Sequence, residues 1–334
     1  MPSEDKKAAK NMKEKLVIGI LAHVDAGKTT LSEQILFETG SIRQKGRVDN
    51  QNTFLDNYEL ERARGITIFS KQAVLKLGEK QVTLLDTPGH VDFSPEMERT
   101  LQVLDYAILV ISGADGVQGH TETLWRLLGR YGIPVFLFVN KMDQEGTDQD
   151  ALMEELKERL HENCVDFSGE RDIRDENLAM CEEAVLETYL AQGHLPDTLI
   201  SELIRQRKAF PCYFGSALKE IGIELFLEGL SVYMKAPAYG KEFAARVYKI
   251  SRDEQGNRLT HLKITGGTLK VKEELASPAG GEKVNQIRIY SGARYETVQE
   301  MQAGMVCAVT GPVKTFPGQA LGAEKNMKSP FLEP

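Results

Sequence analysis

The stretch AHVDAGKTT, from Ala22 to Thr30, constrains the fold of this chain more than any other feature. It follows the apolar run LVIGIL and leads into TLSEQILFE, which has the pattern of a helix. A turn that joins a buried strand to a helix and ends in Gly-Lys-Thr is typical of phosphate-binding loops. The usual loop begins with glycine. Because position 22 lies where the strand ends, an alanine with negative φ is tolerated there.

The loop predicts a defined set of contacts to a nucleotide. Its backbone N–H groups should surround the β-phosphate at the positive end of the helix, and Gly27 should allow the phosphate to approach closely. Lys28 would bridge β- and γ-phosphate oxygens, and the Thr29 hydroxyl would bind Mg2+. The candidate nucleotide-binding residues of this loop are Asp25, Ala26, Gly27, Lys28, Thr29 and Thr30.

The same alternation of apolar runs and helical stretches continues along the chain. The runs VTLLD, YAILVIS and PVFLFVN are short and continuous, which is typical of strands buried on both faces of a mostly parallel sheet. AVLKLGEKQVTLLD predicts a hairpin that adds an antiparallel edge to that sheet. The charged sequence from about 148 to 205 has a helical pattern and predicts a helical insertion packed on one side of the domain.

A second domain is expected after Pro237, where the pattern changes to β segments separated by glycine and charged turns. Such spacing suggests a small β-barrel. We therefore expect an α/β P-loop domain with flanking helices, followed by an all-β barrel. The expected boundaries are 1–14 for a flexible N-terminus, 15–237 for the nucleotide-binding domain and 238–334 for the barrel.

Composition excludes several classes of protein. The 334 residues suffice for two domains, and the net charge of −8 argues against a general nucleic-acid binder, so any RNA contact should be local. No apolar run approaches the roughly 18 residues of a membrane span, and the charged N-terminus lacks a signal sequence, so we expect no membrane partner and a cytoplasmic protein.

The cysteines and most of the histidines indicate no metal centre. The four cysteines, which form no C-x-x-C pair, are expected to be buried free thiols. Five histidines lack ligand spacing and are expected to be surface or packing residues: His23, His120, His161, His194 and His261.

Three later motifs indicate the nucleotide. DTPGH follows VTLL, so Asp86 should hold Mg2+ through water, and Gly89 should offer a backbone N–H to the γ-phosphate. NKMD follows PVFLFV. A carboxylate at Asp143 would accept from the N1–H and the exocyclic amine of guanine, a pair that adenine does not present. GSAL follows PCYF and should place backbone near the guanine carbonyl. The candidate base-binding residues are Asn140, Lys141, Asp143, Ser216, Ala217 and Leu218.

Taken in order, AHVDAGKTT, RARGITI, DTPGHVDF, NKMD and GSAL resemble the translational GTPases of the elongation factor G superfamily. Within this superfamily, the segments LERARGITI, GIPVFLFVNKMDQEGTD and FPCYFGSALKEIGI most resemble those of the ribosomal-protection tetracycline resistance proteins. Elongation factor G also carries an alanine at the position of Ala22. The resemblance implies a GTP-hydrolysing protein that acts on the ribosome. It also implies three further domains, so we expect this chain to be the N-terminal part of a longer factor.

The resemblance implies further site residues. Thr67 in RGITI matches the threonine that meets Mg2+ and the γ-phosphate, and His90 matches the catalytic histidine of the class. Val24 and Ile66 match an apolar gate that flanks this histidine until sarcin-ricin RNA of the ribosome draws it inward. Asp25 could additionally help to hold a monovalent cation, although a polar loop residue is the simpler interpretation.

The expected reaction is in-line attack of water on GTP, with charge stabilised by Lys28, Mg2+ and the loop N–H groups, while His90 orients the water. No arginine in these motifs is placed to act in cis, so hydrolysis should be slow until a partner stimulates it. We expect a monomer. An alternative is a GTP-controlled switch with a non-ribosomal partner. A P-loop kinase is disfavoured because NKMD specifies guanine.

Overall fold

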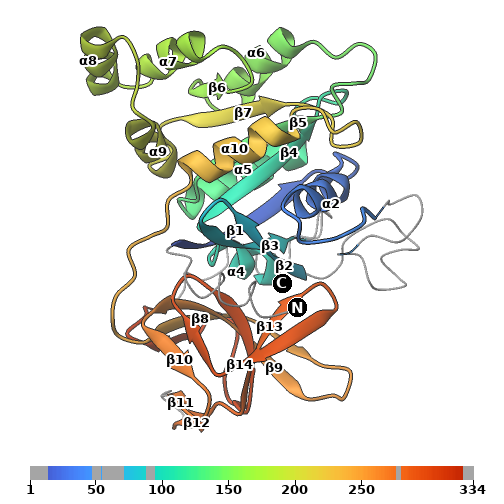
Figure 1. Cartoon of the computed structure of the whole chain (residues 1–334), viewed down its shortest axis with the longest axis vertical. Helices are drawn as coiled ribbons and strands as arrows, with labels where there is room; N and C mark the ends of the chain where they lie inside the picture. Colours follow the sequence, from blue (N-terminus) through green and yellow to red (C-terminus); the bar gives the residue numbers. More distant parts are fainter. Residues whose placement is uncertain (1–13, 47–53, 55–70, 88–94, 276–279, 326–334) are drawn as a thin grey trace.

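The computed structural model describes residues 14–46, 54, 71–87, 95–275 and 280–325, and these form an α/β part and a β part (Figure 1). The strands of the α/β part are β1 (Glu14–Ala22), β2 (Lys71–Leu77), β3 (Lys80–Asp86), β4 (Tyr106–Ser112), β5 (Val135–Asn140), β6 (Cys164–Asp166) and β7 (Phe210–Phe214). Its helices are α2 (Lys28–Glu38), α4 (Pro95–Leu101), α5 (Gly119–Arg130), α6 (Gln149–Arg159), α7 (Arg171–Ala179), α8 (Glu183–Gln192), α9 (Asp197–Arg205) and α10 (Ile223–Tyr233).

The seven α/β strands form one sheet in the order β2-β3-β1-β4-β5-β7-β6. All neighbouring strands run parallel except β2, which pairs antiparallel with β3 as the predicted hairpin edge. The predicted mostly parallel sheet is therefore confirmed. Strand β6 lies in the stretch that was predicted to be helical. It was missed because its three residues, CVD, are too short to show a strand pattern among charged helices.

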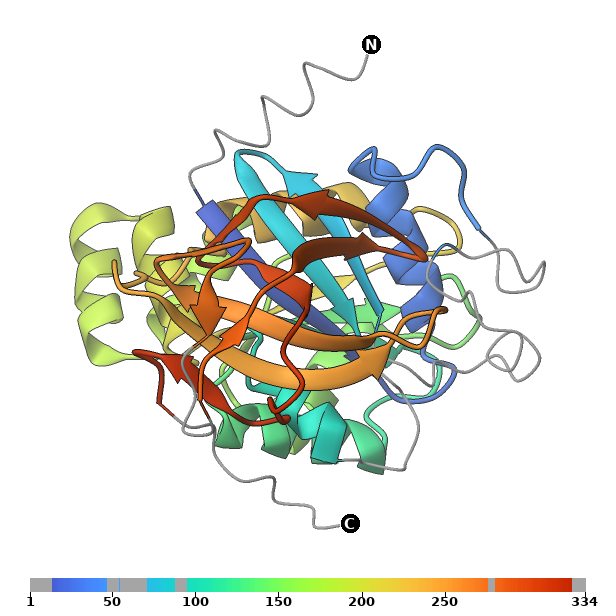
Figure 2. The ribbon, with the colours of Figure 1, turned by 90° about the horizontal axis from the view of Figure 1, so that it is seen from below.

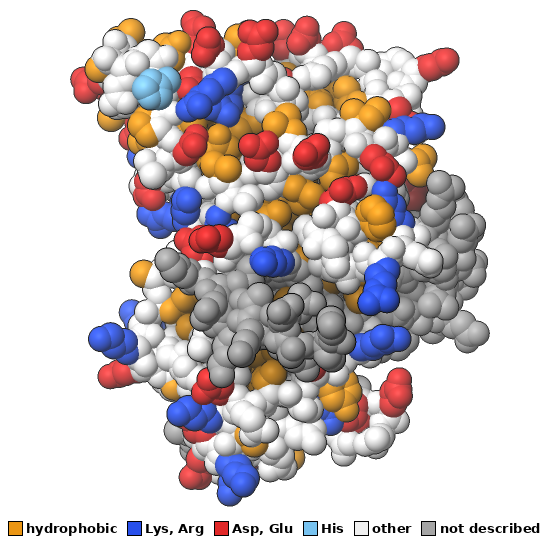
Figure 3. All heavy atoms as spheres, viewed as in Figure 1, with side chains coloured by type: hydrophobic (Ala, Val, Ile, Leu, Met, Phe, Trp, Pro, Cys, Tyr) orange, Lys and Arg blue, Asp and Glu red, His pale blue; other side chains and the backbone are white. Residues whose placement is uncertain are grey.

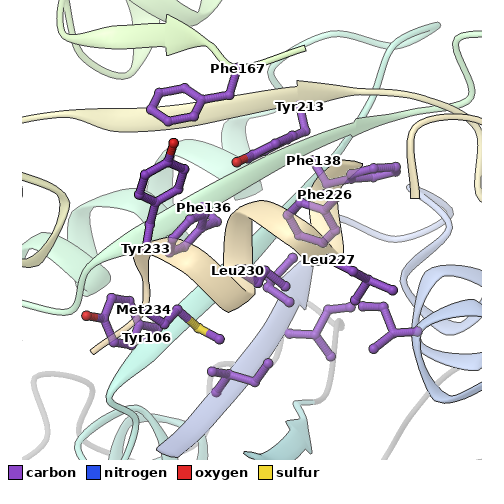
Figure 4. Packing of buried hydrophobic residues seen from close by; sticks show 14 of the residues in the cluster. Tyr106, Phe136, Phe138, Phe167, Tyr213, Phe226, Leu227, Leu230, Tyr233 and Met234 are labelled. Carbon is purple, nitrogen blue, oxygen red and sulfur yellow. The ribbon is translucent and has the colours of Figure 1, made fainter. Parts of the chain in front are cut away.

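The sheet is buried on both faces, which explains why its strands read as continuous apolar runs. In β1, Leu16, Ile18 and Ile20 point into one core, whereas Val17 and Leu21 point into the other. The first core lies beneath α2, α9 and α10, where aromatic side chains from strands and helix α10 pack together (Figure 4). The second lies beneath α4, α5 and α6.

The β part contains β8 (Ala244–Arg252), β9 (Arg258–Gly266), β10 (Thr268–Lys270), β11 (Glu274–Leu275), β12 (Glu282–Lys283), β13 (Gln286–Ser291), β14 (Arg294–Val298), β15 (Glu300–Gln302), β16 (Val306–Thr310) and β17 (Ala320–Gly322). Six strands form an antiparallel sheet in the order β14-β13-β16-β9-β8-β17, and β10-β15 and β11-β12 form two short pairs. The strands curve around their own apolar core, as the predicted barrel requires (Figure 2).

Specific contacts join the two parts. The Lys263 ammonium of β9 donates to the Asp105 carboxylate at 2.6 Å, and both side chains are buried. At the other side of the interface, the Gln72 side chain donates to the Tyr290 carbonyl oxygen at 2.9 Å. Tyr248 packs into the second core of the α/β part. The interface therefore combines a buried ion pair, hydrogen bonds and apolar packing.

Three of the four cysteines have the burial that the sequence predicts. Cys164, Cys212 and Cys307 are buried free thiols as expected, but Cys181, which follows the exposed Met180 at the C-terminal cap of α7, is only partly buried. Within the described residues, no helix is long and apolar enough to cross a membrane. The same residues contain no group of three or more His, Cys, Asp or Glu side chains arranged to hold a metal ion.

Candidate nucleotide-binding site

The candidate site lies at the carboxyl edge of the parallel sheet. The phosphate loop follows β1, Asp86 ends β3, NKMD begins at the last residue of β5, and GSAL follows β7. Since these strands run parallel within one sheet, their carboxyl ends meet at the same edge. Ligands of open α/β sheets bind at this edge. The fold thus brings together motifs that are far apart in the sequence.

The phosphate loop turns through two residues in the left-handed region. Asp25 has φ 61°, and Gly27 has φ 90° and caps the N-terminus of α2. Ala22 is the last residue of β1 and does not have positive φ, so the glycine of the usual loop is not required there. The Ala26 N–H donates to the His23 carbonyl oxygen at 3.2 Å, which closes the turn before the helix begins.

Gly27 is required for two reasons. Its positive φ disfavours any side chain, and a Cβ at this position would lie 2.2 Å from the Asn140 Nδ2 atom. From the sequence, a glycine is expected at position 27 because a phosphate approaches the loop closely there. The structure adds that the closest neighbouring side chain is the amide of NKMD, which leaves no room for a methyl group.

Asn140 links the NKMD turn to the phosphate loop and to the GSAL turn. Its Nδ2 donates to the Ala26 carbonyl oxygen at 2.9 Å, and its Oδ1 accepts from the Ala217 N–H at 2.8 Å. The side chain is only 3% exposed, so both hydrogen bonds are shielded from water. Asn140 was predicted as a nucleotide-binding residue. Its bridging role was missed because the sequence carries no signal for which distant backbone groups it meets.

The base-recognition residues occupy the turn after β5. Lys141 has φ 64°, and the Met142 N–H donates to the Gly215 carbonyl oxygen at 3.0 Å, which ties NKMD to GSAL. Asp143 follows and is exposed. An exposed carboxylate at the end of a fixed turn is available to a ligand.

The GSAL turn is held by its own backbone. Ser216 and Ile221 exchange two backbone hydrogen bonds of 3.0 Å, and the Ser216 Oγ accepts from the Lys219 N–H at 3.2 Å. Ser216 and Ala217 are buried, whereas the Leu218 side chain is 60% exposed. The contribution of Leu218 to a nucleotide site would therefore come from its backbone.

Lys28 and Asp86 form an ion pair beside the phosphate loop. The Asp86 side chain is fully buried and Lys28 is 8% exposed. The neighbouring Thr87 hydroxyl donates to the Ile20 carbonyl oxygen at 2.8 Å, which fixes the end of β3 against β1. The oxygens of Asp86 and of Thr29, the second residue of α2, are of the kind that Mg2+ prefers.

Four predicted site residues lie outside the described residues: Ile66, Thr67, Gly89 and His90. Val24, the other member of the predicted gate, is described and half-buried in the phosphate loop. Thr30 is half-buried in the first turn of α2. The structure thus brings together the phosphate, base and Asp86 motifs.

Taken together, the loop, the sheet order and the NKMD and GSAL turns define a guanine-nucleotide-binding P-loop protein. Residues 13–236 match the family described as "Elongation factor Tu GTP binding domain". The chain belongs to this family.

The chain is similar to two tetracycline resistance proteins. One is the tetracycline resistance protein TetP of Clostridium perfringens, with 34% identity over 93% of this chain and 52% of the relative. Another is the oxytetracycline resistance protein of Streptomyces rimosus, with 38% identity over 78% of this chain and 44% of the relative. The chain spans about half the length of these relatives.

A crystal structure of a protein from Thermus thermophilus has, over part of its length, a fold similar to this chain, with a TM-score of 0.83. The two sequences are 25% identical, and the match covers 96% of this chain and 56% of that one. The similarity therefore extends beyond the nucleotide-binding part to the β part.

Proposed function

We propose that this chain binds GTP and hydrolyses it to GDP and phosphate as part of a translation factor that acts on the ribosome. The observation that carries the proposal is the Asn140 side chain, which joins the phosphate loop to the GSAL turn through two buried hydrogen bonds. This arrangement holds the phosphate and base motifs in one fixed geometry. The similarity to tetracycline resistance proteins supports the ribosome as the partner. The factor we propose is monomeric and cytoplasmic.

The proposal gives each of these site residues a role, which for Thr67 rests on the resemblance to the translational GTPases. The loop N–H groups from Asp25 to Thr30 would hold the phosphates, and Asp143 would accept from both guanine donors. Lys28, now paired with Asp86, would exchange this carboxylate for phosphate oxygens. Asp86 (through water), Thr29 and Thr67 would hold Mg2+, which supplies charge neutralisation on the phosphates when bound. The exposed Asp25 could also contact a monovalent cation.

The hydrolytic step is assigned to His90. By resemblance to the translational GTPases, its imidazole orients the attacking water, and Gly89 offers an N–H to the γ-phosphate. Val24 and Ile66 would keep the imidazole away until the ribosomal sarcin-ricin RNA repositions it. Because the water needs orientation only in the transition state, removal of the imidazole should lower the rate and leave nucleotide affinity unchanged.

The test compares wild type with His90→Ala in GTP affinity, intrinsic hydrolysis and ribosome-stimulated hydrolysis. It uses this chain and the longer protein that the resemblance implies. We expect equal affinity, a modest intrinsic change and a stimulated rate lower by several orders of magnitude, of about the size found for water-positioning groups in other GTPases. Full stimulated turnover in the variant would exclude His90 as the catalytic residue. If ribosomes do not stimulate the wild type, the alternative of a switch with a non-ribosomal partner is favoured.

A further inference from the structure

A cavity of about 480 Å³ lies between the α/β part and the β part. Its lining includes Asp105 and Tyr106 at the start of β4 and Pro134 just before β5. These are the amino ends of parallel strands, whereas the nucleotide motifs lie at the carboxyl ends. The cavity is therefore distinct from the nucleotide site and lies at the opposite edge of the sheet.

Both parts of the molecule contribute cations to this cavity. Arg205 comes from the end of α9 and Lys235 from the segment after α10, while Arg246 comes from β8 and Lys325 follows β17. The segment after α10 descends along one side of the molecule in Figure 1. On that side, Figure 3 shows a notch between the two parts, with Lys and Arg side chains on its upper rim.

Within the described lining, Asp105 is the one acidic residue. Its carboxylate is already engaged, because it accepts from Lys263 Nζ at 2.6 Å and from the Val17 N–H at 2.8 Å. The positive charge of the other lining residues is thus not neutralised by Asp105. The cavity wall carries a net positive charge.

The cations differ in how far they are satisfied. Arg205 pairs with Glu202 at 2.7 Å and Arg246 with Glu324 at 3.1 Å, but the buried Nε of Arg246 has no hydrogen-bond partner among the described residues. Among the described residues, no carboxylate lies within ion-pair distance of the ammonium groups of Lys235 and Lys325. These two lysines are exposed and available to a ligand.

The main chain that carries Lys235 is held in place. The Tyr106 hydroxyl accepts from the Lys235 N–H at 3.0 Å and donates to the Lys235 carbonyl oxygen at 3.2 Å. Arg246 is held by its bond to the Gln102 carbonyl oxygen, 3.0 Å long. The main chain at Lys235 and the side chain of Arg246 are therefore already fixed before a ligand binds, which lowers the entropy cost of binding.

We propose that this cavity binds a small multivalent phosphate anion and that the anion links the two parts of the molecule. Its volume falls in the usual range for small-ligand sites, roughly 300–1,000 Å³, and such sites favour domain interfaces. Guanidinium and ammonium groups from both parts line this cavity, and such groups suit phosphate oxygens. A concave cavity of this size favours a small di- or triphosphate compound over an RNA strand, which would need an extended basic groove.

The test is calorimetric titration of tripolyphosphate into the protein saturated with GDP, without added Mg2+. Saturating GDP blocks the phosphate loop. We expect one equivalent to bind wild type, and binding at least tenfold weaker in K235A/K325A. K76A/K270A, which removes one exposed lysine from each part outside the cavity, should stay within twofold of wild type. K235R/K325R, which keeps both charges, should retain binding.

Three results would overturn the proposal. One is equal binding by wild type and K235A/K325A. Another is binding of tripolyphosphate to the nucleotide-free protein but not to the GDP-saturated protein, since that would assign the anion to the phosphate loop. The third is tight binding of a single-stranded RNA decamer with no binding of tripolyphosphate. Thermal unfolding of each variant checks that it is folded, and tripolyphosphate should raise the wild-type Tm but not that of K235A/K325A.

Discussion

The Asn140 Nδ2 atom donates a hydrogen bond to the Ala26 carbonyl oxygen at 2.9 Å, so the base-recognition turn is tied directly to the phosphate loop. The same side chain accepts from the Ala217 N–H. The phosphate loop, the NKMD turn and the GSAL turn are therefore held in one arrangement before a nucleotide binds. Preorganisation of this kind raises affinity without a new contact to the ligand.

We predict that Asn140→Ala weakens GDP binding and lowers the free energy of unfolding. The substitution leaves the Ala26 carbonyl and the Ala217 N–H without their buried partner, and each unsatisfied group costs about 1–3 kcal/mol. Calorimetry with GDP and urea unfolding measure the two effects. The matched control is Asn177→Ala, which removes an exposed amide whose one hydrogen bond to a described residue goes to the Ile173 carbonyl oxygen at 2.9 Å. Equal behaviour of the two variants would contradict the bridging role.

We predict that Asp143→Asn moves base preference from guanine to xanthine. The carboxylate accepts two donors of guanine, whereas an amide suits the exchanged donor and acceptor of xanthine. Competition between GDP and xanthosine diphosphate on wild type and variant measures the change. Because Asp143 is exposed, the free energy of unfolding without nucleotide should stay within about 0.5 kcal/mol of wild type. Unchanged GDP affinity, with no gain for xanthosine diphosphate, would exclude Asp143 as the guanine acceptor.

The nucleotide motifs could be predicted from the sequence because each strand and the loop that follows it are contiguous. LVIGIL precedes the phosphate loop and PVFLFV precedes NKMD, so local patterns place both at strand ends. The bonds that join these parts could not be predicted. Asn140 and Ala26 are 114 positions apart, and Lys263 and Asp105 are 158 apart. Pairing over such separations depends on strand order and on domain packing, which leave no local pattern.

We predict that Asp105→Asn destabilises the interface between the two parts. The pKa of Lys263 lies below its usual value, because burial lowers it more than the Asp105 carboxylate raises it. The variant leaves this buried ammonium without its counter-charge. Breaking a buried pair in this way costs about 3–5 kcal/mol. Asparagine can still accept from the Val17 N–H, which wild-type Asp105 bonds at 2.8 Å, so the loss reports the ion pair.

A double-mutant cycle with Lys263→Met separates the pair from its surroundings. The double variant Asp105→Asn/Lys263→Met should recover part of the stability lost in Asp105→Asn, because no buried charge is left. The deficit of Asp105→Asn should also shrink as pH rises toward the usual lysine pKa of about 10.4, because an unpaired Lys263 can deprotonate in the folded state. Additive effects in the cycle and a constant deficit with pH would show that the pair contributes no coupling.

We predict that His261 of β9 makes the folded protein less stable as the pH falls. Its Nε2 lies 2.7 Å from the Ser251 Oγ, and its ring packs edge-on against Tyr248 and at a tilt beside Tyr290. Burial, with a smaller contribution from the positive charge of Lys249, lowers the pKa of His261 to about 3. The unfolded chain takes up a proton near the usual histidine pKa of about 6.5, which the folded chain does not accept until far lower pH.

The sign of the effect follows from proton binding. Between pH 6.5 and pH 3 the unfolded state binds more protons than the folded state, so this histidine makes stability fall as pH falls. The slope is at most about 1.4 kcal/mol per pH unit, which gives up to about 2 kcal/mol between pH 6.5 and pH 5. His261→Gln keeps a polar partner for Ser251 but does not titrate. Urea unfolding at pH 7, 6 and 5 should therefore show a smaller loss in the variant. Parallel curves for the two proteins would mean that His261 is protonated in the folded state at the usual pH, and that burial does not control its charge.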